Sequence, residues 1–312
     1  MNIGFLRRPV LARQPNGVMN QLQMHLLFVA YSLCLLALNA SVLDALIELS
    51  RRDATASHLI LVPFVTAALM WLKRESIFRS VRSYGPFEIS VFVVAVALSW
   101  AGYTFLAPHS GQDVLSTSVS ILVVLWVSGF LLFYGHAAFR AALFPLLFLA
   151  FMVPIPSAVL VWATQFLKSG SAEVVDLLFA VSGTPVHRNG FVFELPKFAI
   201  EIADECSGIR SSIGLMLTTL LAGDMLLRTG WKKALLVTLI LPLVVLKNGI
   251  RIVTLSLLGT YVDTSFITGK LHHEGGMVFY FIALAILAPI VFLLYNSERG
   301  LSDVPSLKAT QS

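Results

Sequence analysis

The stretch DECSGIRSS, residues 204–212, places a thiol, two acids and a guanidinium directly ahead of an apolar run. A helix that begins at Cys206 would lower the pKa of the thiol, because free N–H groups at a helix N-terminus favour the thiolate. On such a helix Arg210 shares a face with Cys206, while Asp204 and Glu205 cap the helix and hold Arg210. Residue type alone favours a small packing side chain for a lone cysteine, but these neighbours favour a nucleophile.

A second polar stretch, KNGIR, occupies residues 247–251. Asn248 and Arg251 are three residues apart and share a helix face, beside a helix break that we predict at Gly249. The plain alternative is snorkelling, in which Lys247 and Arg251 reach toward lipid headgroups. Polar groups at membrane depth usually face the bundle interior and mark a functional path, which favours a role for this stretch in a site.

A third stretch, LHHEGG at 271–276, contributes imidazoles. His272, His273 and Glu274 are also metal-ligand types, but adjacent residues on a helix diverge by about 100°, and the spacing is not that of the zinc-protease motif. An ordinary helix cap and a metal site remain the alternatives. We favour an imidazole that acts as the base for a thiol, and we expect no metal and no cofactor.

The elements that position these residues are membrane helices. The chain is 57% hydrophobic and 12% charged, whereas a soluble domain is about half apolar and about a quarter charged. We therefore predict an all-α polytopic membrane protein with about eight transmembrane helices. The predicted spans are 24–48, 57–72, 87–107, 113–134, 139–154, 206–227, 233–250 and 272–295.

The remaining segments are shorter. An apolar stretch at 250–262 either continues the seventh span or re-enters the membrane. The insertion at about 155–205 combines an amphipathic helix around 157–181 with an extended segment, GTPVHRNGFVFELP, at 183–196. Of the two cysteines, Cys34 lies in a hydrophobic run and is predicted to be a small buried side chain; a structural disulfide is not expected.

Lys and Arg in short loops indicate the orientation, because cytoplasmic loops retain them. Residues 73–82 and 228–233 are rich in these cations, so we place both loops and both termini in the cytoplasm. The net charge of +5 then marks topology and not a nucleic-acid surface. The chain divides into a cytoplasmic segment 1–23 without a cleavable signal peptide, one membrane domain 24–295 whose insertion at 155–205 is extracytoplasmic, and a cytoplasmic tail 296–312. Cys206, Arg251 and His272 then lie at the outer ends of spans six, seven and eight.

These motifs resemble a known family. ECSGIRSS, NGIR and HHEGG resemble three blocks of the exosortase and archaeosortase family of membrane transpeptidases. SHLILVP at 57–63 resembles its early Ser-His block, with Leu59 where a glycine is common, and FPLLFLAFMVPIP at 144–156 resembles its Pro-rich block. GTPVHRNG also resembles the segment that precedes the cysteine. The resemblance covers roughly residues 57–295.

The resemblance implies a cysteine transpeptidase of the bacterial inner membrane, with its active site on the outer face. Its partners would be membrane lipids, an acceptor nucleophile and secreted proteins that end in a PEP-CTERM-type sorting signal (a motif, a transmembrane helix and a basic cluster). Such systems often accompany exopolysaccharide production. The resemblance makes Cys206 the nucleophile, Arg251 the essential arginine and His272 or His273 the essential histidine; His272 is favoured because it precedes Gly276 by four positions.

Three further residues, Glu205, Arg210 and Asn248, would support the site or bind the substrate motif.

Other functions would use the same residues. A membrane cysteine protease that only hydrolyses its substrate would share all of these side chains, and the fate of the acyl group distinguishes such a protease from a transpeptidase. A transporter or flippase, or a scaffold of a polysaccharide-export complex, are the non-enzymatic alternatives; the hydropathy pattern has no inverted repeat, which disfavours a transporter.

Overall fold

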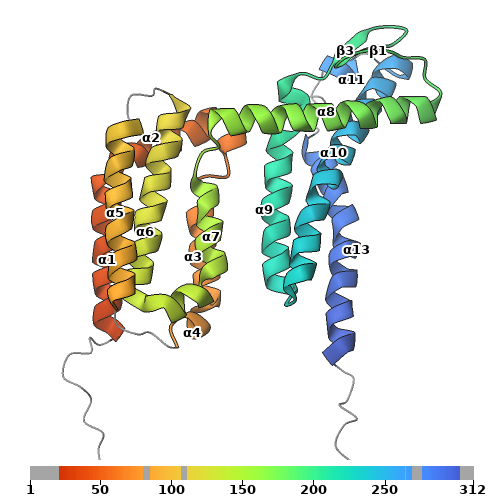
Figure 1. Ribbon diagram of the computed structural model, residues 1–312. Coiled ribbons are helices and arrows are strands. Elements are labelled where there is room, and N and C mark those ends of the chain that lie inside the picture. The colour runs from red at the N-terminus through yellow and green to blue at the C-terminus, as the bar shows by residue number, and fades with distance from the viewer. Residues whose placement is uncertain (1–20, 80–84, 107–110, 264, 269–275, 303–312) are drawn as a thin grey trace, which may run out of the picture. The chain divides into compact units, whose positions relative to one another are not determined.

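The computed structural model describes residues 21–79, 85–106, 111–263, 265–268 and 276–302, and it is predominantly helical (Figure 1). Within these residues seven helices are long and apolar enough to cross a membrane, or eight if the bent helix pair Leu143–Met152 and Ser157–Ser182 counts as a span. The prediction of an all-α polytopic membrane protein is therefore confirmed. The chain forms two compact units, unit 1 (Met1–Arg51 with Leu59–Pro154) and unit 2 (Arg52–His58 with Ile155–Ser312).

Unit 1 is a helical bundle held by aromatic packing. Its elements are α1 (Gln21–Leu38), α2 (Ala40–Arg52), α3 (Leu61–Leu72), α4 (Arg74–Ile77), α5 (Pro86–Leu106), α6 (Gln112–Ala141), α7 (Leu143–Phe148) and the 3-10 helix η2 (Leu149–Met152). Phe28 of α1 contacts the rings of Trp126, Phe130 and Tyr134 on α6. Because aromatic pairs contribute beyond their buried area, this cluster fixes α1 against α6.

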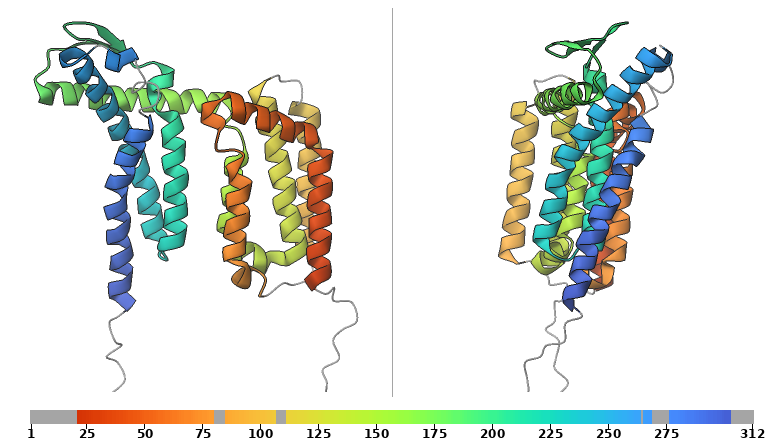
Figure 2. Two further views of the ribbon diagram at one scale, coloured as in Figure 1. Left: turned by 180° about the vertical axis from the view of Figure 1, so that it is seen from behind. Right: turned by 90° about the vertical axis from the view of Figure 1, so that its right-hand side faces the viewer.

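Unit 2 contains the described polar motifs, DECSGIRSS and KNGIR. It begins with the 3-10 helix η1 (Ala54–Ala56) and continues with α8 (Ser157–Ser182), η3 (Asp204–Ser207), α9 (Ile209–Leu226), α10 (Gly230–Tyr261), α11 (Ser265–Thr268) and α13 (Gly276–Ser302). Helices α9, α10 and α13 lie side by side, and α8 lies across α10 and contacts α9 (Figures 1 and 2). A shared apolar core that includes Leu215, Leu236 and Ala283 joins the three helices.

A small sheet lies on the opposite side of α8 from α9 (Figure 2). Its antiparallel strands are β1 (His187–Asn189), β2 (Val192–Glu194) and β3 (Ala199–Glu201), in the order β1-β2-β3. Phe193 of β2 is fully buried together with Phe179 of α8 and Val253 of α10. The predicted extended segment is thus confirmed, and β3 leads directly into η3, the turn that carries Cys206.

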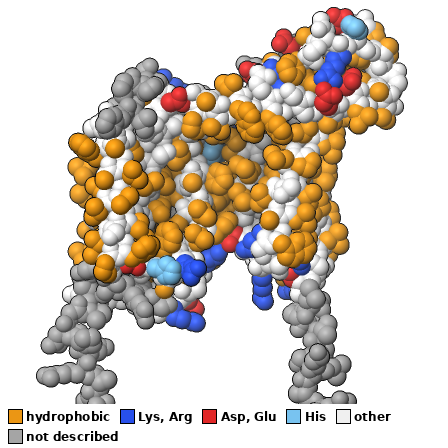
Figure 3. Space-filling model, viewed as in Figure 1, with side chains coloured by type: hydrophobic (Ala, Val, Ile, Leu, Met, Phe, Trp, Pro, Cys, Tyr) orange, Lys and Arg blue, Asp and Glu red, His pale blue; other side chains and the backbone are white. Residues whose placement is uncertain are grey.

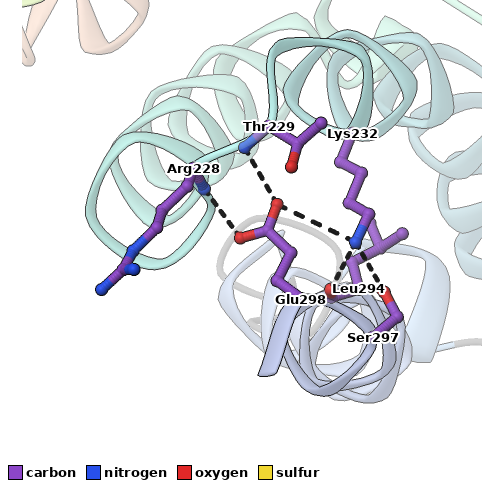
Figure 4. Close-up of polar contacts among 6 residues, drawn as sticks. All are labelled: Arg228, Thr229, Lys232, Leu294, Ser297 and Glu298. Carbon is purple, nitrogen blue, oxygen red and sulfur yellow. Dashed lines mark hydrogen bonds and ion pairs between the residues drawn. The ribbon is translucent and has the colours of Figure 1, made fainter. Parts of the chain in front are cut away.

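A polar cluster joins α13 to the α9–α10 turn (Figure 4). The Glu298 carboxylate accepts hydrogen bonds from the backbone N–H groups of Arg228 (2.8 Å) and Thr229 (2.9 Å), just before the first residue of α10. Lys232 is buried and donates to Ser297 Oγ at 2.8 Å. An acid at a helix N-terminus satisfies free N–H groups and interacts favourably with the helix dipole, so Glu298 caps α10 from a neighbouring helix.

Two details of the span prediction are corrected. The first predicted span is two helices, α1 and α2, which meet at Asn39, and the fifth is the short α7 followed by η2. Of the two alternatives for the stretch 250–262, continuation of the seventh span is confirmed, because α10 extends as far as Tyr261. The predicted helix at 157–181 is confirmed as α8.

Cys34 is exposed on α1 and is not the buried side chain that its hydrophobic surroundings predicted. Hydrophobic side chains also cover the sides of the helices in each unit (Figure 3). In a membrane protein an apolar stretch faces lipid as readily as protein, so hydropathy does not distinguish the two environments.

Candidate active site

A cavity of about 810 Å³ lies within unit 2. Pockets that bind ligands typically measure roughly 300–1,000 Å³, so the cavity has room for a peptide segment. Apolar side chains of α8 and α9 form part of its wall. Its titratable lining comes from η1 and its flanks, from η3, and from α9, α10 and α13: Asp53, His58, Asp204, Arg210, Arg251 and Tyr280.

The turn that carries Cys206 borders this cavity on both sides of the cysteine. Asp204 and Gly208 both line the cavity. The side chains of Glu205 and Cys206 lie outside the described atoms; their backbone belongs to η3. The backbone therefore brings the predicted nucleophile to the same cavity as Arg251, although the two residues are 45 positions apart.

The helix start predicted at Cys206 is wrong. Gly208 adopts a left-handed conformation (φ 78°), and α9 begins only at Ile209. Because η3 and Gly208 interrupt the helix, the four-residue spacing does not place Cys206 and Arg210 on one helical face. The capping role predicted for Asp204 is also wrong, because its carboxylate is 2.7 Å from the Lys168 ammonium of α8.

Lys168 fixes the turn from the side of α8. Its side chain is buried, donates to Asp204 Oδ1, and lies 4.8 Å from the centre of the Phe191 ring. Immediately ahead of the turn, Ile202 is buried in the core beneath the sheet and donates its backbone N–H to Phe191 O. The ion pair thus holds Asp204, and the sheet holds Ile202, so the chain is fixed just ahead of Cys206.

Asn248 holds the turn from the side of α10. The side chain is fully buried, and its Nδ2 donates to Ser171 Oγ of α8 at 2.9 Å. A Cβ atom added at Gly208 would lie 2.8 Å from Asn248 Oδ1. The amide therefore packs directly against the glycine two residues after Cys206.

The predicted break at Gly249 is also wrong, because α10 continues through it. A Cβ atom there would lie 2.4 Å from Val174 Cγ1 of α8. The glycine allows the two helices to approach closely, and this approach brings Asn248 within hydrogen-bonding distance of Ser171.

The structure also contradicts snorkelling for Lys247. The side chain is only 3% exposed, and its ammonium donates to Ser211 Oγ on α9. Burying a charge at membrane depth requires a polar partner, and Ser211 provides one. Arg251, one turn further along α10, lines the cavity, and its Nε atom is shielded from solvent.

The structure brings together some of the predicted site residues. Arg210 and Arg251 line the cavity, and Asn248 supports the neighbouring turn. His272 and His273 lie outside the described residues. Sequence reasoning missed His58, Lys168 and Tyr280; the only signal for any of them was the family resemblance of residues 57–63, which gave no role to the histidine.

Comparison with known proteins identifies the family of this chain. Residues 50–289 match the transmembrane exosortase family, and this range includes η1, the cysteine turn and Arg251. No curated protein and no solved structure matches the chain. Since the matched range covers most of the sequence, the chain belongs to the transmembrane exosortase family.

Proposed function

We propose that this protein is a membrane cysteine transpeptidase that cleaves the C-terminal sorting signal of secreted proteins through a thioester on Cys206. The observation that carries the proposal is the cavity that both flanks of Cys206 share with Arg251. A thiol beside a fixed cation suits acyl transfer, in which a negative charge develops on the carbonyl oxygen.

The proposed reaction begins when His272 or His273 takes the proton of the Cys206 thiol. The resulting thiolate attacks the scissile carbonyl, and Arg251 stabilises the oxyanion. The C–N bond then breaks, the departing amine takes up a proton, and the secreted protein remains as a thioester on Cys206. An acceptor amine resolves the thioester in transpeptidation, whereas water resolves it in simple hydrolysis. Family membership supports the link to secreted proteins and, as part of the proposal, to exopolysaccharide production.

Trapping the thioester tests this function. Purified Cys34→Ala protein, reconstituted with a secreted protein that carries the sorting signal, should yield an acyl adduct on the peptide containing Cys206, detected by mass spectrometry after acid quenching. Hydroxylamine should release the adduct, because it cleaves thioesters. Cys206→Ala should leave the substrate full-length and anchored by its tail helix. An adduct at another residue, or cleavage of the substrate by the Cys206→Ala protein, would contradict the proposal.

The proposed orientation places the cavity on the outer face of the bacterial inner membrane. From Ile209 at the cavity, the 18 residues of α9 rise about 27 Å to Leu226, close to the roughly 30 Å thickness of the hydrocarbon core. The cationic α9–α10 turn thus lies one membrane thickness from the cavity. Retention of Lys and Arg on the cytoplasmic side supports an extracytoplasmic cavity.

Thiol labelling of intact cells checks this orientation. In a Cys34→Ala/Cys206→Ala background, Asn189→Cys on exposed β1 should react with a membrane-impermeant maleimide. Thr229→Cys in the α9–α10 turn should react only after the membrane is permeabilised; this substitution keeps the backbone N–H that Glu298 binds. The reverse labelling pattern would place the cavity in the cytoplasm.

A further inference from the structure

The segment from Asp53 to His58 belongs to unit 2, although it precedes most of unit 1 in the sequence. It forms η1, which contacts α9. Asp53 and His58 line the cavity that also borders the cysteine turn. More than 140 residues separate His58 from Cys206 in the chain, so only tertiary structure brings this imidazole to the site.

Hydrogen bonds within the segment give the turn a defined shape. Asp53 Oδ1 accepts from both the backbone N–H and the hydroxyl of Thr55, each at 2.7 Å. Ser57 Oγ donates to Ala54 O at 2.9 Å. Short side-chain-to-backbone bonds of this kind stabilise turns over extended chain.

The same turn determines the tautomer of His58. Its Nδ1 lies 3.0 Å from Thr55 O. A carbonyl oxygen only accepts hydrogen bonds, so Nδ1 carries a proton in this contact. In the neutral ring Nε2 is then the basic nitrogen, and in the imidazolium it is the acidic N–H. Catalytic histidines are oriented in this way, through a hydrogen bond at the nitrogen that does not react.

We propose that His58, within the transpeptidation proposed above, is a catalytic residue that transfers protons to the leaving amine and from the acceptor amine. In acylation the C–N bond breaks, and the departing nitrogen takes the proton from Nε2 of the imidazolium. The products are a thioester on Cys206, a free amine and a neutral imidazole. In the second step the acceptor amine attacks the thioester and loses a proton to Nε2 as the thiolate leaves. The new amide forms, and both the thiolate and the imidazolium are restored.

This role has a consequence that needs no substrate. In the tetrahedral intermediate the leaving nitrogen and the cysteine sulfur are bonded to the same carbon, so a proton donor for the nitrogen also lies near the sulfur. A nearby imidazolium favours the thiolate and lowers the pKa of the thiol. Asp53 and Asp204 oppose this effect, and Arg210 and Arg251 add to it. These four groups stay the same when only His58 is replaced, and Tyr280, the remaining titratable group of the lining, also stays the same.

The test uses His58→Asn in full-length Cys34→Ala protein, so that Cys206 is the only thiol. An asparagine amide can still donate to Thr55 O, but it neither supplies nor accepts the transferred proton. Iodoacetamide labelling of Cys206 should shift to higher pH, because the thiol loses its cationic neighbour. Processing of the secreted substrate should fall about 100-fold, within the usual range for removal of a general acid or base.

Ser57→Ala is the matched control, because it removes a hydrogen bond of the same turn without changing the imidazole. It should keep the labelling profile and most of the processing. An unchanged labelling profile in His58→Asn, or an equal loss in Ser57→Ala, would overturn the inference. If the Cys206 adduct forms but His58→Asn behaves like the parent protein, only the His58 role fails. If no adduct forms on Cys206, the proposed function itself fails.

Discussion

Arg251→Lys is expected to lose roughly 99% of substrate processing while the protein stays folded. Removing one donor to a developing oxyanion typically costs about 10²–10³ in rate. Lysine keeps the charge, but it presents a single ammonium in place of the planar fork of donors that a guanidinium holds in fixed geometry. Arginine and lysine have similar helix propensities, so α10 should remain intact.

The measurement is the initial rate of processing at equal enzyme levels, with thermal unfolding as the check on folding. Arg210→Lys is the matched control, because Arg210 borders the same cavity but is exposed on α9. It should lose less than tenfold. If Arg251→Lys processes its substrate at nearly the normal rate, the guanidinium has no specific role in the reaction, and the snorkelling interpretation regains support.

Hydropathy predicts the long helices well, because most of the predicted apolar spans form helices that are long and apolar enough to cross a membrane within the described residues. It does not predict what their side chains contact. Cys34 shows this limit, since an apolar position on α1 proved to be exposed. Boundaries also shift where a break comes from one residue, as at Asn39 between α1 and α2.

Some of the residues of the candidate site can be predicted from the sequence, but their local geometry cannot. Residue type and spacing singled out Cys206, Asn248 and Arg251, because polar groups stand out in an apolar sequence. The local geometry around them depends on contacts between distant segments. The sequence predicted a helix break at Gly249, but α10 is continuous there, and the glycine allows close packing against Val174 of α8. The imidazole of His58 reaches the cavity through tertiary structure, which no local pattern encodes.

Gly208 is expected to tolerate replacement poorly, for reasons that combine conformation and packing. Its φ of 78° lies in the left-handed region, where a residue with a Cβ atom pays about 1–2 kcal/mol. A Cβ there would also lie 2.8 Å from Asn248 Oδ1 and 3.0 Å from Asn248 Cγ. Gly208→Ala therefore requires either the asparagine or the cysteine turn to move.

The asparagine has little room to move. It is fully buried and hydrogen-bonded to Ser171, and the helix that carries it packs closely on α8 through Gly249. The turn is the more adaptable partner, and Cys206 is only two residues away. Since a displacement of about 1 Å at a reacting group can cost about 100-fold in rate, Gly208→Ala should lose at least that much processing.

Two further variants separate displacement of the nucleophile from general destabilisation. Gly183→Ala provides the same kind of backbone strain at the C-terminus of α8, with φ 67° and nothing within 4 Å of the added Cβ. It should lower thermal stability but keep most of the processing. The double variant Gly208→Ala/Asn248→Ala removes the steric conflict but keeps the backbone strain at position 208. Asn248→Ala should therefore reduce processing less when it is added to Gly208→Ala than when it is made alone. If Gly208→Ala and Gly183→Ala lose processing equally, or if the two substitutions at 208 and 248 are simply additive, the contact between Gly208 and Asn248 does not position Cys206.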